Sequence, residues 1–276
     1  MFDIGMSSCG FDFNDRIFKE LSENGINNVE VSLAPDKFQD FDYKEAKRLS
    51  DAYGVKLWSY HLPFLPFSRI EISSADKSIR EYSVKLFAEL IKKGRDIGID
   101  NYIVHPSGEP ISDSERPERL KCSMESLAYL ADTAANEGAV ICVEDLPRTC
   151  LSSNIADLKT LISADERLKI CFDVNHLLKD SHSDFIDAFS DKIVTTHISD
   201  YDFIDERHWL PGEGKIDWFA LAKKLKEVGY NGVWMYELGF DEPKTLKRVR
   251  ALTCEDFATN ARCIFEGKYP PSFVKK

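Results

Sequence analysis

The chain has 276 residues, of which 43% are hydrophobic and 12% aromatic, so it can bury a large core. No run approaches the roughly 18 apolar residues that predict a membrane span, and the first ten residues lack the basic region and apolar stretch of a signal peptide. A net charge of −11 disfavours a polyanion or a membrane surface as partner, although a local basic patch could still bind phosphate.

Short β-rich runs alternate with longer helical patterns along the chain, an order typical of βαβ units with a parallel sheet. No linker rich in Gly, Ser or Pro divides the sequence, which predicts one domain over residues 1–276. Eight runs are predicted to be strands: residues 2–7, 28–32, 56–61, 101–105, 140–144, 168–173, 193–199 and 232–238.

The helical patterns between these strands are amphipathic. Residues 75–97, 118–137 and 218–228 carry apolar side chains at helical spacing, and Asp217 is a candidate N-cap for the third helix. The last helix is predicted at 243–266, before an irregular tail. Glycine provides the left-handed position that stops a helix, and five predicted helices end at one: Gly25, Gly54, Gly98, Gly138 and Gly229.

Eight similar units in 276 residues fit a (β/α)8 barrel, a fold that typically has about 250 residues. An open doubly wound sheet is disfavoured because no G-x-G-x-x-G follows the first strand. The predicted fold class is therefore α/β, a single-domain (β/α)8 TIM barrel. The seven cysteines are scattered without a C-x-x-C pair, which predicts a reduced, cytoplasmic protein without a disulfide framework.

Six consecutive predicted strands have, at or within two residues of their carboxyl ends, a side chain that can bind a metal ion: His61, His105, Glu144, Asp173, His197 and Glu237. A single histidine there is usually structural or solvated, and a single carboxylate often caps the next helix. In a barrel, however, the carboxyl ends of the strands meet at one mouth, where catalytic groups gather. Carboxylates held together repel one another unless a cation neutralises them. The pattern therefore predicts a divalent-metal site.

Further candidate residues lie just beyond the strand ends. His176 follows Asp173 by three residues, whereas His182 lies in a polar loop and is expected to be solvated. The loop after the seventh strand adds Glu206, Arg207 and His208. Three arginines in predicted mouth loops could bind a substrate phosphate or lie solvated: Arg69, Arg148 and Arg207. Four aromatic residues could face a sugar ring or pack within the barrel: Trp58, Phe64, Phe67 and Trp209.

Five short motifs stand out: ICVE at 141–144, FDVNH at 172–176, HISD at 197–200, PGEGKIDW at 211–218 and YE at 236–237. With these motifs the chain resembles, over nearly its whole length, the xylose isomerase-like TIM barrels. That superfamily includes sugar phosphate isomerases and epimerases, D-tagatose 3-epimerase-type enzymes and endonuclease IV. The motifs are specific for the superfamily but weak for the substrate.

The resemblance to the epimerase branch implies four metal ligands: Glu144, Asp173, His197 and Glu237. The implied cation is Mn²⁺, Mg²⁺, Co²⁺ or Zn²⁺, among which mixed carboxylate and imidazole ligation cannot choose. Glu144 and Glu237 are the expected catalytic pair, one removing a proton beside a carbonyl to give an enediolate and the other returning a proton. The expected substrate-binding residues are His176, His61, His105, His208 and Arg207. The substrate is expected to be a sugar, a sugar phosphate or a related polyol or keto compound.

The same resemblance keeps open an endonuclease IV-like function, a zinc-dependent phosphodiesterase acting on abasic DNA. That branch holds three zinc ions and has an aspartate where this chain has Glu206. The extra ligands of such a multinuclear site are His61, His105, His176, Glu206 and His208. The segment Asp145-Leu146-Pro147-Arg148 departs from that branch, and no cluster of Lys and Arg with interleaved aromatic residues is visible for binding DNA phosphates. Nucleic acid is therefore not the expected partner.

A third alternative is a catalytically inactive metal-binding barrel, because a fold alone does not determine function. An inactive relative is expected to have lost Glu144 or Glu237, and both are present in this chain. A homo-oligomer is compatible with the sequence, which contains no motif that predicts an oligomeric state.

Overall fold

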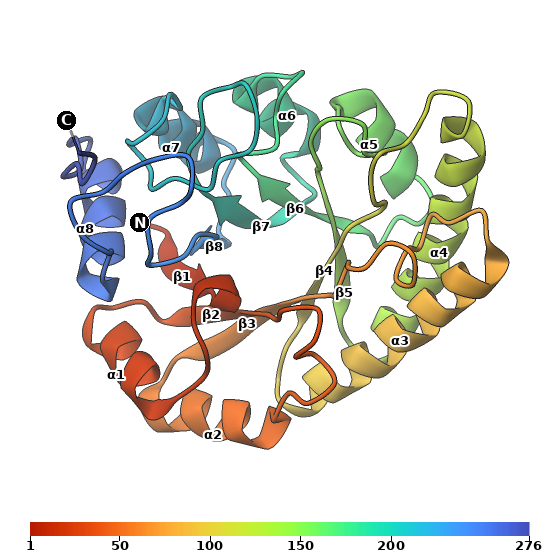
Figure 1. Cartoon of the computed structure of the whole chain (residues 1–276), viewed down its shortest axis with the longest axis horizontal. Helices are drawn as coiled ribbons and strands as arrows, with labels where there is room; N and C mark the ends of the chain where they lie inside the picture. Colours follow the sequence, from red (N-terminus) through yellow and green to blue (C-terminus); the bar gives the residue numbers. More distant parts are fainter. Residues whose placement is uncertain (276) are drawn as a thin grey trace.

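The computed structural model describes residues 1–275 and shows eight parallel strands closed into a barrel, each followed by a helix (Figure 1). Strand β1 pairs with both β2 and β8, which closes the ring. The strands are β1 (Asp3–Ser7), β2 (Asn28–Ser32), β3 (Lys56–His61), β4 (Asn101–Val104), β5 (Val140–Glu144), β6 (Lys169–Asp173), β7 (Ile193–Ile198) and β8 (Val233–Tyr236). The predicted (β/α)8 TIM barrel is thus confirmed, and every predicted strand is present within two residues of its expected ends.

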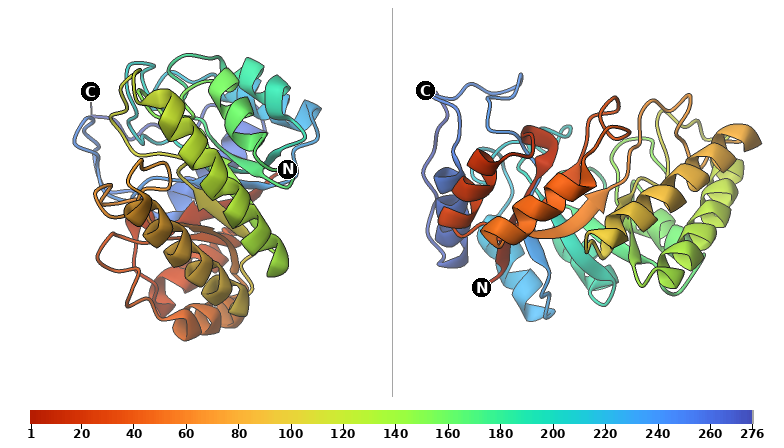
Figure 2. Two further views of the ribbon diagram at one scale, coloured as in Figure 1. Left: turned by 90° about the vertical axis from the view of Figure 1, so that its right-hand side faces the viewer. Right: turned by 90° about the horizontal axis from the view of Figure 1, so that it is seen from below.

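The helices form a ring outside the barrel, and the two longest, α3 and α4, pack side by side (Figures 1 and 2). They are α1 (Asp15–Glu23), α2 (Tyr43–Tyr53), α3 (Lys77–Asp96), α4 (Arg116–Asn136), α5 (Ile155–Ile162), α6 (His182–Phe189), α7 (Trp218–Glu227) and α8 (Cys254–Phe265). Asp217 caps α7 as predicted, because its side chain accepts a hydrogen bond from the amide of Ala220. The five predicted glycine stops all have a positive φ. None of the helices in the described part of the chain is long and apolar enough to cross a membrane.

The predicted start of the last helix is wrong, since α8 begins at Cys254 rather than near residue 243. Thr253 and Asp256 form a capping box that starts the helix at this point. The preceding segment is held outside the helix by Arg248, which is 2% exposed and pairs with Glu213 at 2.8 Å. The main-chain amide of Val249 also donates to the tail, to the oxygen of Phe273.

A register shift between β2 and β3 shapes the barrel interior. Val29 pairs with Leu57 and Glu30 pairs with Ser59, so Trp58 is an extra residue in β3. The indole of Trp58 donates to Thr195 on β7, and the hydroxyl of Ser59 donates to Glu30. Both neighbouring side chains therefore point into the barrel, and Trp58 does not form the sugar-facing wall that the sequence suggested as one option.

Candidate metal centre

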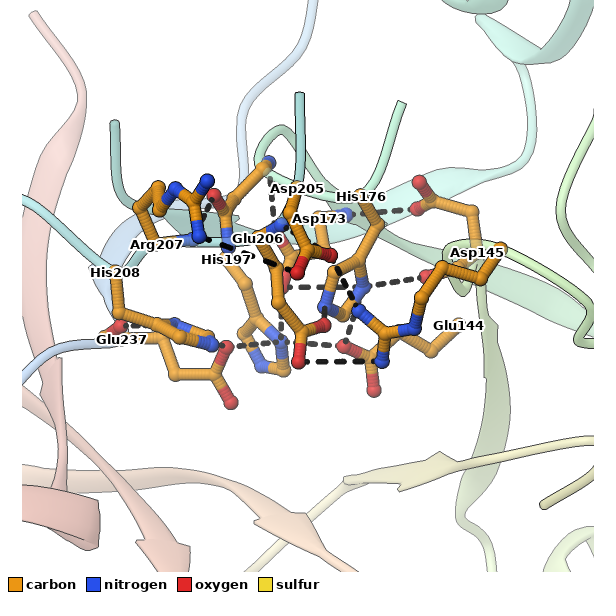
Figure 3. A network of polar contacts seen from close by, with 12 residues as sticks. Glu144, Asp145, Asp173, His176, His197, Asp205, Glu206, Arg207, His208 and Glu237 are labelled. Carbon is orange, nitrogen blue, oxygen red and sulfur yellow. Dashed lines mark hydrogen bonds and ion pairs between the residues drawn. The ribbon is translucent and has the colours of Figure 1, made fainter. Parts of the chain in front are cut away.

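Three side chains predicted as metal ligands converge around the ring of the fourth, His197, which is buried near the end of β7. Its Nδ1 atom lies 3.1 Å from Glu144 Oε1, 3.5 Å from Glu237 Oε2 and 3.9 Å from Asp173 Oδ2. Glu144 and Asp173 end β5 and β6, whereas Glu237 directly follows β8. Figure 3 shows Glu144 and Glu237 on opposite sides of the His197 ring.

The second oxygen of Glu144 faces two more histidines from the strand ends. Glu144 Oε2 lies 3.2 Å from His61 Nε2 and 3.1 Å from His105 Nε2. His61 ends β3, and His105 directly follows β4. One carboxylate therefore has potential co-ligands on both of its sides, so it could bind one cation or bridge two.

Two buried carboxylate oxygens at this centre, Glu144 Oε2 and Asp173 Oδ2, have no hydrogen-bond partner in the described chain. Buried polar atoms in proteins are almost always satisfied, and an unpaired one is costly. The imidazole nitrogens of His61 and His105 lie close to Glu144 Oε2 without donating to it. The possible ligand atoms of His61, Glu144, His197 and Glu237 all lie within 4.8 Å of one another. A divalent cation fits this set of oxygen and nitrogen donors.

A second group of possible ligands lies beside the first: His176, Glu206 and His208, whose ligand atoms lie within 4.8 Å of one another. His176 Nε2 is 3.3 Å from Glu206 Oε2. The Nδ1–H groups of both histidines donate to main-chain carbonyl oxygens, those of Asp145 and Glu237, at 2.8 and 3.1 Å. In the neutral ring, their Nε2 atoms therefore carry lone pairs, which can bind a cation or accept hydrogen bonds from substrate hydroxyl groups.

The charges at the centre shift the pKa values of its acids in opposite directions. Burial disfavours ionisation of Glu144, but His197 and His105 outweigh it and hold the pKa of Glu144 well below its usual range. Burial raises the pKa of Glu237 well above its usual range, and the charges of Asp173 and Glu144 add to this effect. The two glutamates thus differ in proton affinity, as expected of an acid and base pair.

The histidines respond to the same charges. Burial disfavours the cationic form of His61, but the close contact with the Glu144 carboxylate outweighs it and raises the pKa to about 9. For His105, burial prevails and lowers the pKa. Burial also opposes the cationic form of His197, yet the surrounding anionic groups raise its pKa well above the usual range. The metal-free centre therefore holds protons that a bound cation would displace.

Arg148 ties together three loops at the rim of the cleft. Its guanidinium lies 3.0 Å from Glu109, 2.7 Å from Asp205 and 3.3 Å from Glu206. Burial opposes ionisation of Glu206, but His176 and then Arg148 outweigh it and lower its pKa to about 2. Arg148 has a φ of 53°, a strained backbone for this residue type that is common near functional sites.

The other candidate arginines lie apart from the ligands. Arg207 pairs with Asp202 at 3.0 Å and does not line the cleft, so its expected contact with substrate stays a prediction. The guanidinium of Arg69 lies over the ring of Tyr82.

The cleft over the centre has a volume of about 290 Å³. Phe64 and Phe67 line it beside the histidines, whereas the Trp209 indole donates to Thr245 outside it. His182 is not solvated as expected, because its Nε2–H donates to the carbonyl oxygen of Val174 at 2.7 Å. The ring also lies close to Phe172 and Tyr201.

Sequence reasoning missed Glu30, which is fully buried inside the barrel on β2. Its Oε2 atom lies 3.1 Å from His197 Nε2 and accepts the hydroxyl of Ser59 at 2.8 Å. The prediction considered residues at the ends of the third to eighth strands, whereas Glu30 lies in the middle of the second. The available signal was a single charged residue in the uncharged run Asn28-Val29-Glu30-Val31-Ser32.

Comparison with known proteins identifies related chains. A family model described as "Xylose isomerase-like TIM barrel" matches residues 18–253. Fructoselysine 3-epimerase from Shigella flexneri is 24% identical, over 91% of this chain and 98% of the relative. A probable endonuclease 4 from Thermoplasma acidophilum is 25% identical, over 72% of each chain. Among solved structures, 3-keto-D-glucoside 4-epimerase from E. coli matches with a TM-score of 0.76 and 19% identity, over 96% of this chain and 99% of that one.

Proposed function

Because the chain belongs to the xylose isomerase-like TIM barrel family, we propose that it is a divalent-metal-dependent isomerase or epimerase. Its substrate is a sugar, a sugar phosphate or a related polyol or keto compound. The observation that carries the proposal is the placement of Glu144 and Glu237 on opposite sides of His197, with Asp173 completing the ligand set. The names of two relatives, a fructoselysine 3-epimerase and a 3-keto-D-glucoside 4-epimerase, support the same reaction class.

In this mechanism, Glu144, Asp173, His197 and Glu237 hold the cation, which is Mn²⁺, Mg²⁺, Co²⁺ or Zn²⁺. When bound, the cation polarises a substrate carbonyl and its neighbouring hydroxyl. One glutamate removes the proton from the carbon beside the carbonyl, giving an enediolate. The other glutamate delivers a proton to the opposite face in an epimerase, or to the neighbouring carbon in an isomerase.

The remaining histidines of the cleft position the substrate in this proposal. The Nδ1–H group of His61 donates to the carbonyl oxygen of Leu62, so once a bound cation has displaced the second proton of the ring, its Nε2 carries a lone pair like those of neutral His176 and His208. Such nitrogens accept hydrogen bonds from sugar hydroxyl groups. Phe64 and Phe67 provide an apolar wall on one side of the same cleft.

Incubation with a panel of ketoses and ketose phosphates in D2O tests the proposal, because a carboxyl group that returns the proton can exchange with solvent. Deuterium is expected at the carbon beside the carbonyl of the true substrate, with loss of configuration there for an epimerase. For an isomerase, the label is expected at the neighbouring carbon. The proposal fails if the panel shows neither labelling nor conversion while abasic-site DNA is cleaved in a zinc-dependent way.

A second candidate function, a zinc-dependent phosphodiesterase acting on abasic DNA, is favoured by two observations. Glu144 has histidines on both of its sides, and His176, Glu206 and His208 form a separate group of ligands. Metal analysis separates the two functions, because one ion per chain supports the epimerase and three zinc ions support the phosphodiesterase. A catalytically inactive metal-binding barrel remains the third alternative, and any turnover that depends on Glu144 and Glu237 excludes it.

A further inference from the structure

His197, at the middle of the centre, presents the opposite ring nitrogen to the ligands from the one that three neighbouring histidines present to the cleft. His61, His176 and His208 each donate Nδ1–H to a neutral main-chain carbonyl and present Nε2 to the cleft. His197 instead presents Nδ1 to the carboxylates, and its Nε2 lies 3.1 Å from the carboxylate of Glu30. Its partner on the far side from the ligands is thus charged, whereas the partners of the other three are neutral.

The position of Glu30 depends on the register shift between β2 and β3. This shift places Ser59 opposite Glu30, and the Ser59 hydroxyl donates to the same oxygen that faces His197. The carboxylate is therefore oriented from one side by Ser59 and from the other by His197.

Fold stability alone does not account for a carboxylate in this place. Glu30 is completely inaccessible to solvent, and its Oε1 atom has no hydrogen-bond partner in the described chain. A buried charge with an unsatisfied oxygen lowers stability relative to a well-packed apolar side chain. A carboxylate behind a metal-binding histidine, by contrast, fixes the tautomer and orientation of the ring and raises the basicity of the ligand.

We infer that Glu30 is a positioning residue that holds His197 as the Nε2–H tautomer, with the Nδ1 lone pair directed at the cation bound by Glu144, Asp173 and Glu237. Glu30 thereby sets the affinity of the centre for the cation without touching the cation or the substrate. The inference rests on the metal centre of the proposed function but not on the sugar chemistry.

The test compares cation binding by the full-length wild-type protein and Glu30→Gln. The amide introduced by this substitution keeps the volume and an acceptor atom but removes the charge, and it can also turn its NH2 group toward the ring. The dissociation constants for Mn²⁺, Co²⁺ and Zn²⁺ are measured by competition with a chelator, and the absorption spectrum of the Co²⁺ form reports on the ligand geometry. We expect the dissociation constants to rise about 10- to 100-fold and the Co²⁺ spectrum to change. The melting temperature of the metal-free variant is expected not to fall, because a buried charge has been removed.

Two variants serve as controls. Glu213→Gln alters another buried glutamate, one that pairs with Arg248 outside the centre, and is expected to lower stability while leaving cation affinity unchanged. Glu30→Asp keeps the charge on a shorter side chain and is expected to retain more affinity than Glu30→Gln. Unchanged dissociation constants and spectrum in Glu30→Gln, with a lowered melting temperature, would overturn the inference and leave the proposed function standing. Weakened cation binding in Glu30→Gln, together with no turnover of any sugar by the cation-loaded wild-type protein, would instead support the inference and count against the sugar chemistry.

Discussion

Removal of the cation is expected to lower the thermal stability of the protein, and its return is expected to restore it. The ligands come from β5, β6, β7 and the residue after β8, so the centre exists only in the folded chain. An ion that binds the folded but not the unfolded state must stabilise the fold by mass action. Without the ion, three carboxylates and His197 are left in contact in a buried site.

The size of the effect follows from the free ion concentration and the length of the chain. A free ion concentration 100 times the dissociation constant stabilises the folded state by about 2.7 kcal/mol. Unfolding entropy is roughly 2.1 cal/mol/K per residue, so for 276 residues this stabilisation corresponds to a shift in melting temperature of about 5 °C.

Differential scanning calorimetry of chelator-treated protein, titrated separately with Mn²⁺, Mg²⁺, Co²⁺ and Zn²⁺, measures this shift. Asp173→Asn is the matched control, because it removes one ligand and one repelling charge while keeping the shape of the side chain. The variant is expected to lose most of the ion-dependent shift without a loss of metal-free stability. A wild-type melting temperature that no ion changes, in protein shown to be metal-free by elemental analysis, would refute the centre.

Two further predictions concern the acid and base pair and the pH dependence of binding. Glu144→Gln and Glu237→Gln should each lower the turnover rate about 10²- to 10⁴-fold with an unchanged circular dichroism spectrum, and near-normal turnover in either variant would contradict its role. Cation affinity should increase as pH rises toward 9, because Glu144 raises the pKa of His61 to about 9 despite burial, and a cation on Glu144 displaces that proton. Calorimetric titrations that give the same affinity between about pH 6 and pH 9 would show that no such proton is released on binding.

The strand-end ligands could be predicted from sequence because the barrel itself brings them together. Once eight alternating units are recognised, the last residue of each strand must face one mouth, whatever the detailed packing. That rule placed Glu144, Asp173 and His197 together without any knowledge of distances. The rule also holds when the predicted end of a strand is wrong by a residue, since His105 and Glu237 lie one residue beyond their strands and still line the cleft.

Glu30 could not be found in the same way, because its position depends on strand register. The extra residue Trp58 in β3 changes which side chains face one another across β2 and β3, and nothing in the local sequence marks such an irregularity. The start of the last helix was missed for a related reason. Residues before Thr253 have a helix-compatible composition, but contacts of Arg248 with Glu213 and with the tail, distant in sequence, keep them out of α8.

The number of cations that the cleft holds is the point on which the two candidate functions differ, and the contact of Glu206 with a fixed guanidinium favours the smaller number. Glu206 Oε2 faces His176, but its other oxygen lies 3.3 Å from Arg148. The same guanidinium also pairs with Glu109 and Asp205, so Arg148 forms ion pairs with three carboxylates at the rim of the cleft and is held in place by them. An additional divalent ion at His176 and Glu206 would have to compete with this guanidinium for the Glu206 carboxylate. Around Glu144, Asp173 and Glu237 there is no arginine or lysine partner among the described residues, and their compensation depends on histidines alone. The first divalent ion is therefore expected at His197, where the negative charge lacks a permanent counterion, and this favours a single-ion centre and the sugar chemistry proposed for it.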